Sequence, residues 1–206
     1  RLRAGEAALR PLERLMRTRT IDEAPEAQQL REHVILAGYG VAGRLLGHAL
    51  RQAHAPHIIL DVNAERVREA REHDAPVYYA DVTSDEALEH AAIQHARVLV
   101  LLINDPDALR RAVATARELA PQIHIIARSR YITERETLLR LGADRVVYEE
   151  LESALEVTTR VLNRLNVDPT EAQTFVDLAL ASAGHAHLRT PLETALTVAE
   201  DLATDP

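Results

Sequence analysis

The sequence predicts an α/β fold with a doubly wound, six-stranded parallel sheet, helices on both faces of the sheet, and a short C-terminal helical extension. Three observations support this prediction. Short apolar segments alternate with amphipathic helical segments from residue 33 onward, most of the apolar segments lack polar alternation, and no further strand pattern follows residue 148. Strands that are buried on both faces of a parallel sheet have this continuous apolar character.

The expected strands are short and rich in valine, isoleucine and leucine. They cover residues 33–38, 57–61, 76–80, 97–103, 122–127 and 145–148. The segments between them have helical periodicity and the length that a right-handed crossover needs. We therefore expect all six strands to be parallel, with their carboxyl ends at one edge of the sheet.

Capping residues mark the ends of the expected helices. Asp105 followed by Pro106 is typical of an N-cap with proline at the first helical position, and Gly142 stands where a helix ends in a left-handed residue. Capping-box spacing occurs at Thr83 with Glu86, Thr133 with Glu136, and Thr190 with Glu193. After the sixth strand the pattern predicts helices over 150–165, 169–183 and 191–203.

The chain divides by composition into residues 1–30, 31–166 and 167–206. The first part begins with "RLRAGEAALRPLERLMRTRT", which holds six arginines and two glutamates, and continues into a polar, aperiodic linker. Arginines of this density are typical of a juxtamembrane helix on the cytoplasmic side, although a solvated amphipathic linker helix is the alternative. Because the chain starts at Arg1, we expect it to be a segment of a longer protein.

Composition excludes several functional classes. The 206 residues contain no cysteine and no lysine, which removes disulfides, thiol nucleophiles, Schiff-base lysines and the Walker lysine. The formal net charge of −8 argues against nucleic acid as a partner. No apolar run is long enough to span a bilayer. These features favour a folded domain in the cytoplasm.

A G-x-G-x-x-G motif follows the first expected strand and opens the first helix. Its glycines have separate roles in a Rossmann-like fold: Gly38 allows a tight turn, Gly40 leaves room for a phosphate, and Gly43 lets helix and strand pack closely. The free N–H groups of the helix start would then bind the anion. The candidate binding residues here are Gly38, Tyr39, Gly40, Val41, Ala42 and Gly43.

Asp61 ends the second expected strand, where a ribose-binding acid is expected. Its carboxylate can accept hydrogen bonds from both hydroxyls of a ribose diol and would repel a 2′-phosphate, so NADP is disfavoured. The alternative is that the glycines serve only packing and Asp61 caps the following helix.

Further polar residues follow the later strands at the same edge. Asp81 could accept from an adenine amino group, whereas Thr83 could be only a helix cap. Arg128 and Arg130 could bind phosphates or an acidic effector, although a structural ion pair is the alternative for Arg130. The remaining candidate binding residues are Val62, Asp81, Val82, Thr83, Asn104 and Arg128.

Five segments carry a family resemblance: "HVILAGYGVAGRLLGHAL", "IILDVN", "YYADVTSDEALEHA", "VLVLLINDPDALRRAVATAREL" and "IIARSRYITERETLLRLGADRVVYEEL". Across residues 31–166 the chain resembles the TrkA-N or RCK domain that regulates potassium conductance. It is most similar to the cytosolic tail of Kef-type potassium/proton antiporters in the monovalent cation:proton antiporter-2 family. Ala80 departs from the glycine that this family often has before the acid.

The resemblance implies a regulatory domain that binds AMP or NAD(H) and gates ion transport. It implies a homodimer formed through the helix at 150–165, whose leucine face comprises Leu151, Leu155, Leu162 and Leu165. It also implies a transport domain in the same chain, a location at the cytoplasmic face of the inner (plasma) membrane, and in some members a response to glutathione.

An NAD-dependent oxidoreductase is the alternative function. Such an enzyme normally needs a second domain that holds the substrate, and residues 167–206 are too short to form one. We therefore expect no catalytic residues and no enzyme activity. His185 and His187 are two residues apart but have no further ligands nearby, so no metal site is expected.

Overall fold

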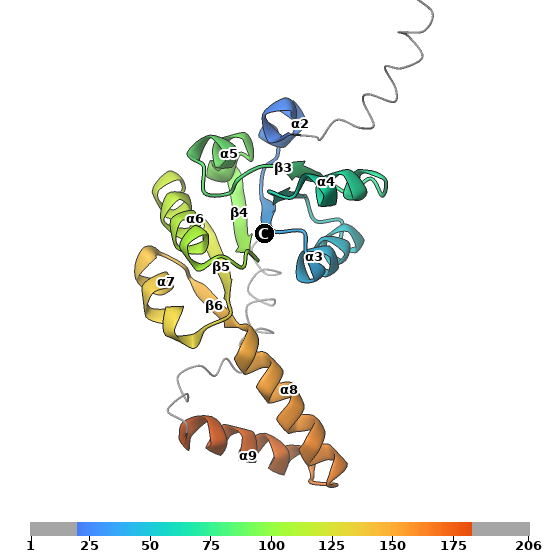
Figure 1. Cartoon of the computed structure of the whole chain (residues 1–206), viewed down its shortest axis with the longest axis vertical. Coiled ribbons are helices and arrows are strands. Elements are labelled where there is room, and N and C mark those ends of the chain that lie inside the picture. The colour runs from blue at the N-terminus through green and yellow to red at the C-terminus, as the bar shows by residue number, and fades with distance from the viewer. Residues whose placement is uncertain (1–19, 183–206) are drawn as a thin grey trace, which may run out of the picture. The chain divides into compact units, whose positions relative to one another are not determined.

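The computed structural model describes residues 20–182 and contains the predicted six-stranded, all-parallel sheet (Figure 1). The strand order is β3-β2-β1-β4-β5-β6. The strands are β1 His33–Ala37, β2 His57–Asp61, β3 Val77–Tyr79, β4 Ala96–Leu101, β5 His124–Ser129 and β6 Arg145–Tyr148. The predicted doubly wound α/β fold is confirmed.

Helices cover both faces of this sheet, as Figure 1 shows. On one face, α3 (Val41–Gln52) and α4 (Ala64–Arg71) pack on the half of the sheet that contains β1, β2 and β3. On the other face lie α5 (Asp85–His90), α6 (Pro106–Leu119) and α7 (Arg135–Leu141). The buried residues form a separate apolar cluster on each face, so each helical layer has its own core.

The winding direction of the chain reverses between the central strands β1 and β4, and the crevice at this reversal is the place of the candidate site. From β1 the chain winds outward through β2 to β3, and from β4 it winds in the other direction to β6. The register pairs Val34 with Val98 and Ala37 with Leu101 across this junction. In open parallel sheets the crevice outside the carboxyl ends at such a reversal is where ligands bind.

The structure differs from the sequence prediction at residues 20–29, which were expected to form a linker. They form the short helices η1 (Ile21–Glu23) and α2 (Pro25–Gln28) and pack against α5. Ile21, Ala24 and Ala27 are buried in the core. These buried residues are spaced three apart, but two of the three are alanines in a stretch that is otherwise mostly polar, so the sequence predicts a linker there.

Two of the four predicted caps that fall within the described range are correct. Asp105 accepts from the amide of Ala108 at 2.6 Å, and Gly142 ends α7 with φ of 110°. The predicted capping boxes at Thr83 and Thr133 are wrong: Ser84 is the N-cap of α5, and a turn of 3₁₀ helix precedes α7. The expected box at Thr190 lies outside the described residues.

Two further helices, α8 (Glu149–Arg164) and α9 (Pro169–Ser182), follow the sheet. The chain separates into two compact units, residues 1–150 and 151–206, so most of α8 and all of α9 belong to the second. The predicted boundaries at residues 30 and 166 stay predictions. The expected helix at 191–203 and the pair His185 and His187 lie outside the described residues. No helix between residues 20 and 182 is long and apolar enough to cross a membrane.

The apolar side chains of α8 do not all share one environment. Leu151, Leu155 and Leu162 are half-buried, whereas Leu165 is 67% exposed. A stripe at four-residue spacing is open to solvent and consists of Val157, Val161 and Leu165. The exposed face of α8 is therefore mostly formed by residues other than the predicted leucines.

Candidate functional site

A cavity of about 730 Å³ opens at the carboxyl edge of the sheet, over the ends of β1, β2 and β4. Every predicted binding residue except Tyr39 lines it. The segments after β1, β2, β3, β4 and β5 all contribute, because parallel strands bring their carboxyl ends to one edge. Gly38 and Arg128, which are 90 positions apart along the chain, thus line the same cavity.

The three glycines of the first turn have different physical reasons for lacking a side chain. Gly38 has φ of 103°, a left-handed conformation that disfavours other residues. A Cβ on Gly43 would lie 1.9 Å from the carbonyl oxygen of Gly38, so this glycine allows α3 to approach the turn. A Cβ on Gly40 would meet nothing within 4 Å, so the space beside it is open.

Gly40 is also the N-cap of α3 and provides no side chain to satisfy the first amides of that helix. Unsatisfied N–H groups and the helix dipole together favour an anion at this position. The open space beside Gly40 leads into the cavity. This arrangement suits a phosphate group.

Asp61 is buried at the end of β2, with 5% of its surface exposed. Its Oδ2 accepts from the amide of Tyr39 at 2.6 Å, and its Oδ1 accepts from the amide of Asn63 at 2.7 Å. The Nη1 of Arg66 lies 3.5 Å from Oδ2. These donors compensate the buried negative charge and fix the carboxylate beside the glycine turn.

The alternative role for Asp61 as the cap of the next helix is wrong. The side chain of Asn63 caps α4 and accepts from the amides of Glu65 and Arg66, both at 3.0 Å. Asp61 instead joins two loops that border the cavity. Its carboxylate is thus held by the amide of Tyr39 in the turn after β1 and by the amide of Asn63 at the N-cap of α4.

After β3, the loop at residues 81–83 forms its own hydrogen-bonded turn. Asp81 is exposed, and its Oδ1 accepts from both the amide and the hydroxyl of Thr83, at 2.9 and 2.8 Å. Because Ser84 caps α5, Thr83 serves to orient the Asp81 carboxylate. Val82 is buried beneath this turn.

The far side of the cavity is formed by Arg128 at the end of β5. Its Nη2 donates to the carbonyl of Leu102 at 3.2 Å and to Oδ1 of Asn104. Its Nη1 lies 3.8 Å from Oε2 of Glu149, the first residue of α8. The Nη2 of Arg128 is thus fixed by two hydrogen bonds to residues that follow β4, whereas its Nη1 has a more distant carboxylate as its partner.

Sequence reasoning missed Arg66, Tyr131 and Glu149, which all line the cavity. Glu149 directly follows β6 and could have been found from that position, whereas Arg66 lies in the first turn of α4, five residues after β2 ends. Arg130 lies 5.9 Å from the ring of Tyr131 and makes no ion pair within residues 20–182, so the structural ion-pair alternative is not supported there.

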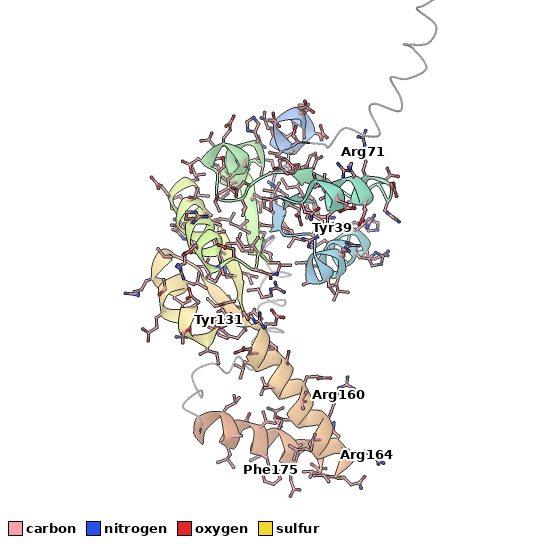
Figure 2. The ribbon with its side chains drawn as sticks, in the orientation of Figure 1. Tyr39, Arg71, Tyr131, Arg160, Arg164 and Phe175 are labelled. Carbon is pink, nitrogen blue, oxygen red and sulfur yellow. The ribbon has the colours of Figure 1, made fainter. Side chains whose placement is uncertain are left out.

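Tyr39 contributes through its backbone and not through its ring. The ring packs beside the α3–α4 core and lies 5.5 Å from the guanidinium carbon of Arg44 (Figure 2). Tyr39 is therefore the one predicted binding residue that does not line the cavity, and its amide holds the Asp61 carboxylate instead. Within the described part of the chain, no three histidine, aspartate or glutamate side chains gather to hold a metal ion.

The TrkA-N domain family matches residues 34–149, which include all six strands of the sheet except His33 at the start of β1. The chain belongs to the TrkA-N domain family. It is 36% identical over 142 residues to the protein named K(+) efflux antiporter KefB of Alkalimonas amylolytica, covering 69% of this chain and 22% of that protein. It is 31% identical to the glutathione-regulated potassium-efflux system protein KefC of Cronobacter sakazakii, covering 76% of this chain and 25% of that protein.

A solved TrkA-N relative has the same fold. The Shewanella denitrificans Kef CTD in AMP-bound form aligns with a TM-score of 0.65 and 30% sequence identity, over 76% of this chain and 96% of that one. The chain spans about a quarter of the length of the two efflux relatives that it matches. It thus corresponds to one portion of such proteins.

Proposed function

We propose that this TrkA-N chain is the ligand-sensing domain of a potassium or cation:proton antiporter and that it binds an adenine nucleotide, AMP or NAD(H), to gate ion transport. The observation that carries the proposal is the placement of the buried Asp61 carboxylate beside the open N-terminus of α3 in one cavity. The two groups suit the ribose diol and the phosphate of one nucleotide.

The polarity of the cavity supports a nucleotide with a free ribose diol. The Asp61 carboxylate is buried and negatively charged, so a 2′-phosphate placed beside it would meet repulsion in a poorly hydrated site. The exposed Asp81 carboxylate lies across the cavity and can accept from an adenine amino group. AMP and NAD(H) meet these requirements, and NADP does not.

A regulatory role is favoured over a dehydrogenase. The efflux relatives bear names of potassium transport proteins, and the solved Kef relative is described with AMP bound. AMP cannot transfer a hydride, so a site that suits it serves recognition rather than redox chemistry. An oxidoreductase remains the second candidate because the glycine turn and Asp61 would also suit NAD(H).

The proposed partners follow from the relatives. We propose a transport domain in the same protein, a homodimer formed through α8, and a location at the cytoplasmic face of the inner membrane. The name of the Cronobacter sakazakii relative supports glutathione as a further effector, and Asn104 and Arg128 are candidates to contact it.

Isothermal titration calorimetry on the 206-residue chain tests the proposal. We expect AMP and NAD(H) to bind and NADP to bind at least tenfold more weakly. Absence of binding by AMP and by NAD(H), or equal affinity for NAD and NADP, would overturn the assignment. Purification of the chain followed by mass spectrometry of released small molecules provides an independent check.

A further inference from the structure

Asp61, Tyr79 and Thr20 lie side by side in one row across the sheet. Asp61 pairs with Tyr79 in the register of β2 and β3, and Thr20 forms an isolated parallel bridge with Tyr79 on its other side. The amide of Ala80 also donates to the carbonyl of Asp61 at 3.2 Å. β3 therefore separates Thr20 from the proposed ribose-binding acid.

Apolar anchors hold residues 20–29, which we call the strap, against the sheet domain. Ile21 is 5% exposed and Ala27 is fully buried. The hydroxyl of Tyr78 in β3 donates to Oε1 of Glu26 at 3.1 Å. Helices of three and four residues are not stable alone, so the strap keeps its structure only while these contacts exist.

The strap and the cavity loop after β3 share one core. Ile21 and Ala24 belong to the same buried cluster as Ala80 and Val82, which line the cavity. The strap also packs on α5, the helix that begins directly after this loop. Packed interiors transmit displacement because they contain few voids, so a shift of the strap would move the loop.

The small size of β3 strengthens this link. The strand has only three residues, and among residues 20–182 its backbone partner on the edge away from β2 is Thr20 of the strap. Loss of the strap would leave it as an exposed edge with pairing on one side only. Residues 80–83 continue directly from β3, so their order depends on that of the strand.

We propose that the strap couples occupancy of the nucleotide site to the chain that precedes Thr20. Nucleotide binding orders the loop at residues 80–83 and thereby favours the docked strap. A pull on the preceding chain undocks the strap and weakens nucleotide binding, as linkage requires of a coupling between two sites. This inference rests on the proposed function for its ligand, but the coupling of strap and loop is a property of the fold.

An engineered disulfide tests the coupling. Because the chain has no cysteine, a double variant with T20C and Y79C would contain these two thiols and no others. Neighbouring strands lie about 4.8 Å apart, within reach of a disulfide. The reduced protein is the matched control for the oxidised one, in which the strap cannot undock. We expect oxidation to slow amide hydrogen exchange at residues 80–84 without ligand, and to lower the Kd for AMP about threefold or more.

The two readouts separate the two proposals. Slower exchange on oxidation together with no AMP binding in either state would refute the nucleotide assignment and support the strap. AMP binding with the same Kd in both states, and unchanged exchange at residues 80–84, would overturn the strap and leave the nucleotide assignment intact.

A pair of core substitutions tests the same coupling without a disulfide. Ile21 and Ile123 are 5% and 4% exposed and belong to the same cluster, but Ile123 lies before β5, far from the strap in sequence. We expect Ile21→Ala to speed amide hydrogen exchange at residues 80–84 more than Ile123→Ala does. We also expect the Kd for AMP to be about threefold or more higher in Ile21→Ala than in Ile123→Ala. Equal effects of both substitutions on loop exchange and AMP binding would overturn the proposal.

Discussion

The amide nitrogen of Tyr39 lies 2.6 Å from Oδ2 of Asp61, so the glycine turn after β1 is hydrogen-bonded to the acid that ends β2. This bond joins the two parts of the candidate site that would contact phosphate and ribose. Hydrogen bonds to a buried carboxylate are stronger than neutral ones. The turn and the acid are therefore held relative to each other by a hydrogen bond of the protein itself.

Asp61→Asn should weaken AMP binding at least tenfold, because a hydrogen bond to a charged acceptor is worth about 1.5–3 kcal/mol. Discrimination against NADP should also decrease, since the repelling charge is absent. Calorimetry with AMP, NAD and NADP measures both effects. Glu65→Gln is the control, because it removes the same charge from the exposed first turn of α4. Unchanged AMP affinity in Asp61→Asn would refute the ribose assignment.

Gly40→Ala and Gly43→Ala should have opposite consequences. At Gly43 the new methyl group would clash with the Gly38 carbonyl, so we expect stability to fall by about 3 kcal/mol. At Gly40 the methyl enters open space, so we expect a loss of about 1 kcal/mol or less with AMP binding weakened at least tenfold. Urea unfolding and calorimetry separate the two outcomes. A Gly40→Ala protein that binds AMP normally would contradict a phosphate at this position.

His33 should make folding sensitive to mild acid. Its ring is fully buried, Nε2 donates to the carbonyl of Ala91 at 2.9 Å, and Nδ1 has no hydrogen-bond partner in the described structure. Burial lowers the pKa of His33, partly opposed by the Ala91 hydrogen bond. The unfolded chain therefore binds more protons, and the free energy of unfolding should decrease as pH falls through about 6.5 towards the folded-state pKa.

Urea unfolding between pH 8 and pH 5 measures this dependence. His33→Gln keeps a donor for Ala91 but does not titrate, so its stability should vary less with pH than that of the wild type. His73→Gln is the control, because His73 is exposed. Identical pH dependence in His33→Gln and the wild type would show that His33 is not responsible.

The exposed stripe of α8 should form the dimer contact. Val157 and Val161 are 61% and 53% exposed, and burial of each side chain is worth about 1.5 kcal/mol or more. We expect the wild type to be a dimer and Val157→Glu with Val161→Glu to be a folded monomer in sedimentation equilibrium. Thr158→Glu adds charge on a neighbouring exposed face of α8 and should remain dimeric. A monomeric wild type at tens of micromolar would refute the dimer.

The chain should not turn over NADH with a panel of carbonyl substrates. The reason is that residues 167–206 are too few for a substrate domain with a positioned acid or base. The decrease of absorbance at the NADH band over time measures the rate of NADH oxidation. A rate well above the uncatalysed one that disappears on substitution of a single histidine or aspartate would favour the oxidoreductase alternative.

The sheet and the residues that line the cavity could be predicted from the sequence because both depend on local patterns. Apolar runs define β1 to β6, and the residue that follows each parallel strand lies at the same edge whatever the helices do. Asp61, Asp81, Asn104 and Arg128 were found in this way. The helix caps at Asp105 and Gly142 could also be predicted, since a cap is a short-range interaction.

The features that the sequence did not reveal depend on contacts between distant segments. Residues 20–29 are mostly polar and their buried side chains include two alanines, so the sequence does not indicate the burial of Ile21 or the bridge between Thr20 and Tyr79. The cap of α5 at Ser84, one residue after Thr83, depends on the turn that Asp81 makes. The exposure of Val157 rather than Leu155 on α8 depends on how neighbouring helices pack, which a helical wheel alone does not determine.

The order of strands also has a consequence for folding kinetics. β1 to β3 and β4 to β6 are each built from neighbouring segments of chain, whereas pairing of β1 with β4 closes a much longer loop. The cavity receives residues from both halves, since Gly38 follows β1 and Asn104 follows β4. A nucleotide bound as proposed would therefore complete its contacts only after the two halves have joined. Such binding would slow unfolding of the domain and leave its rate of folding unchanged.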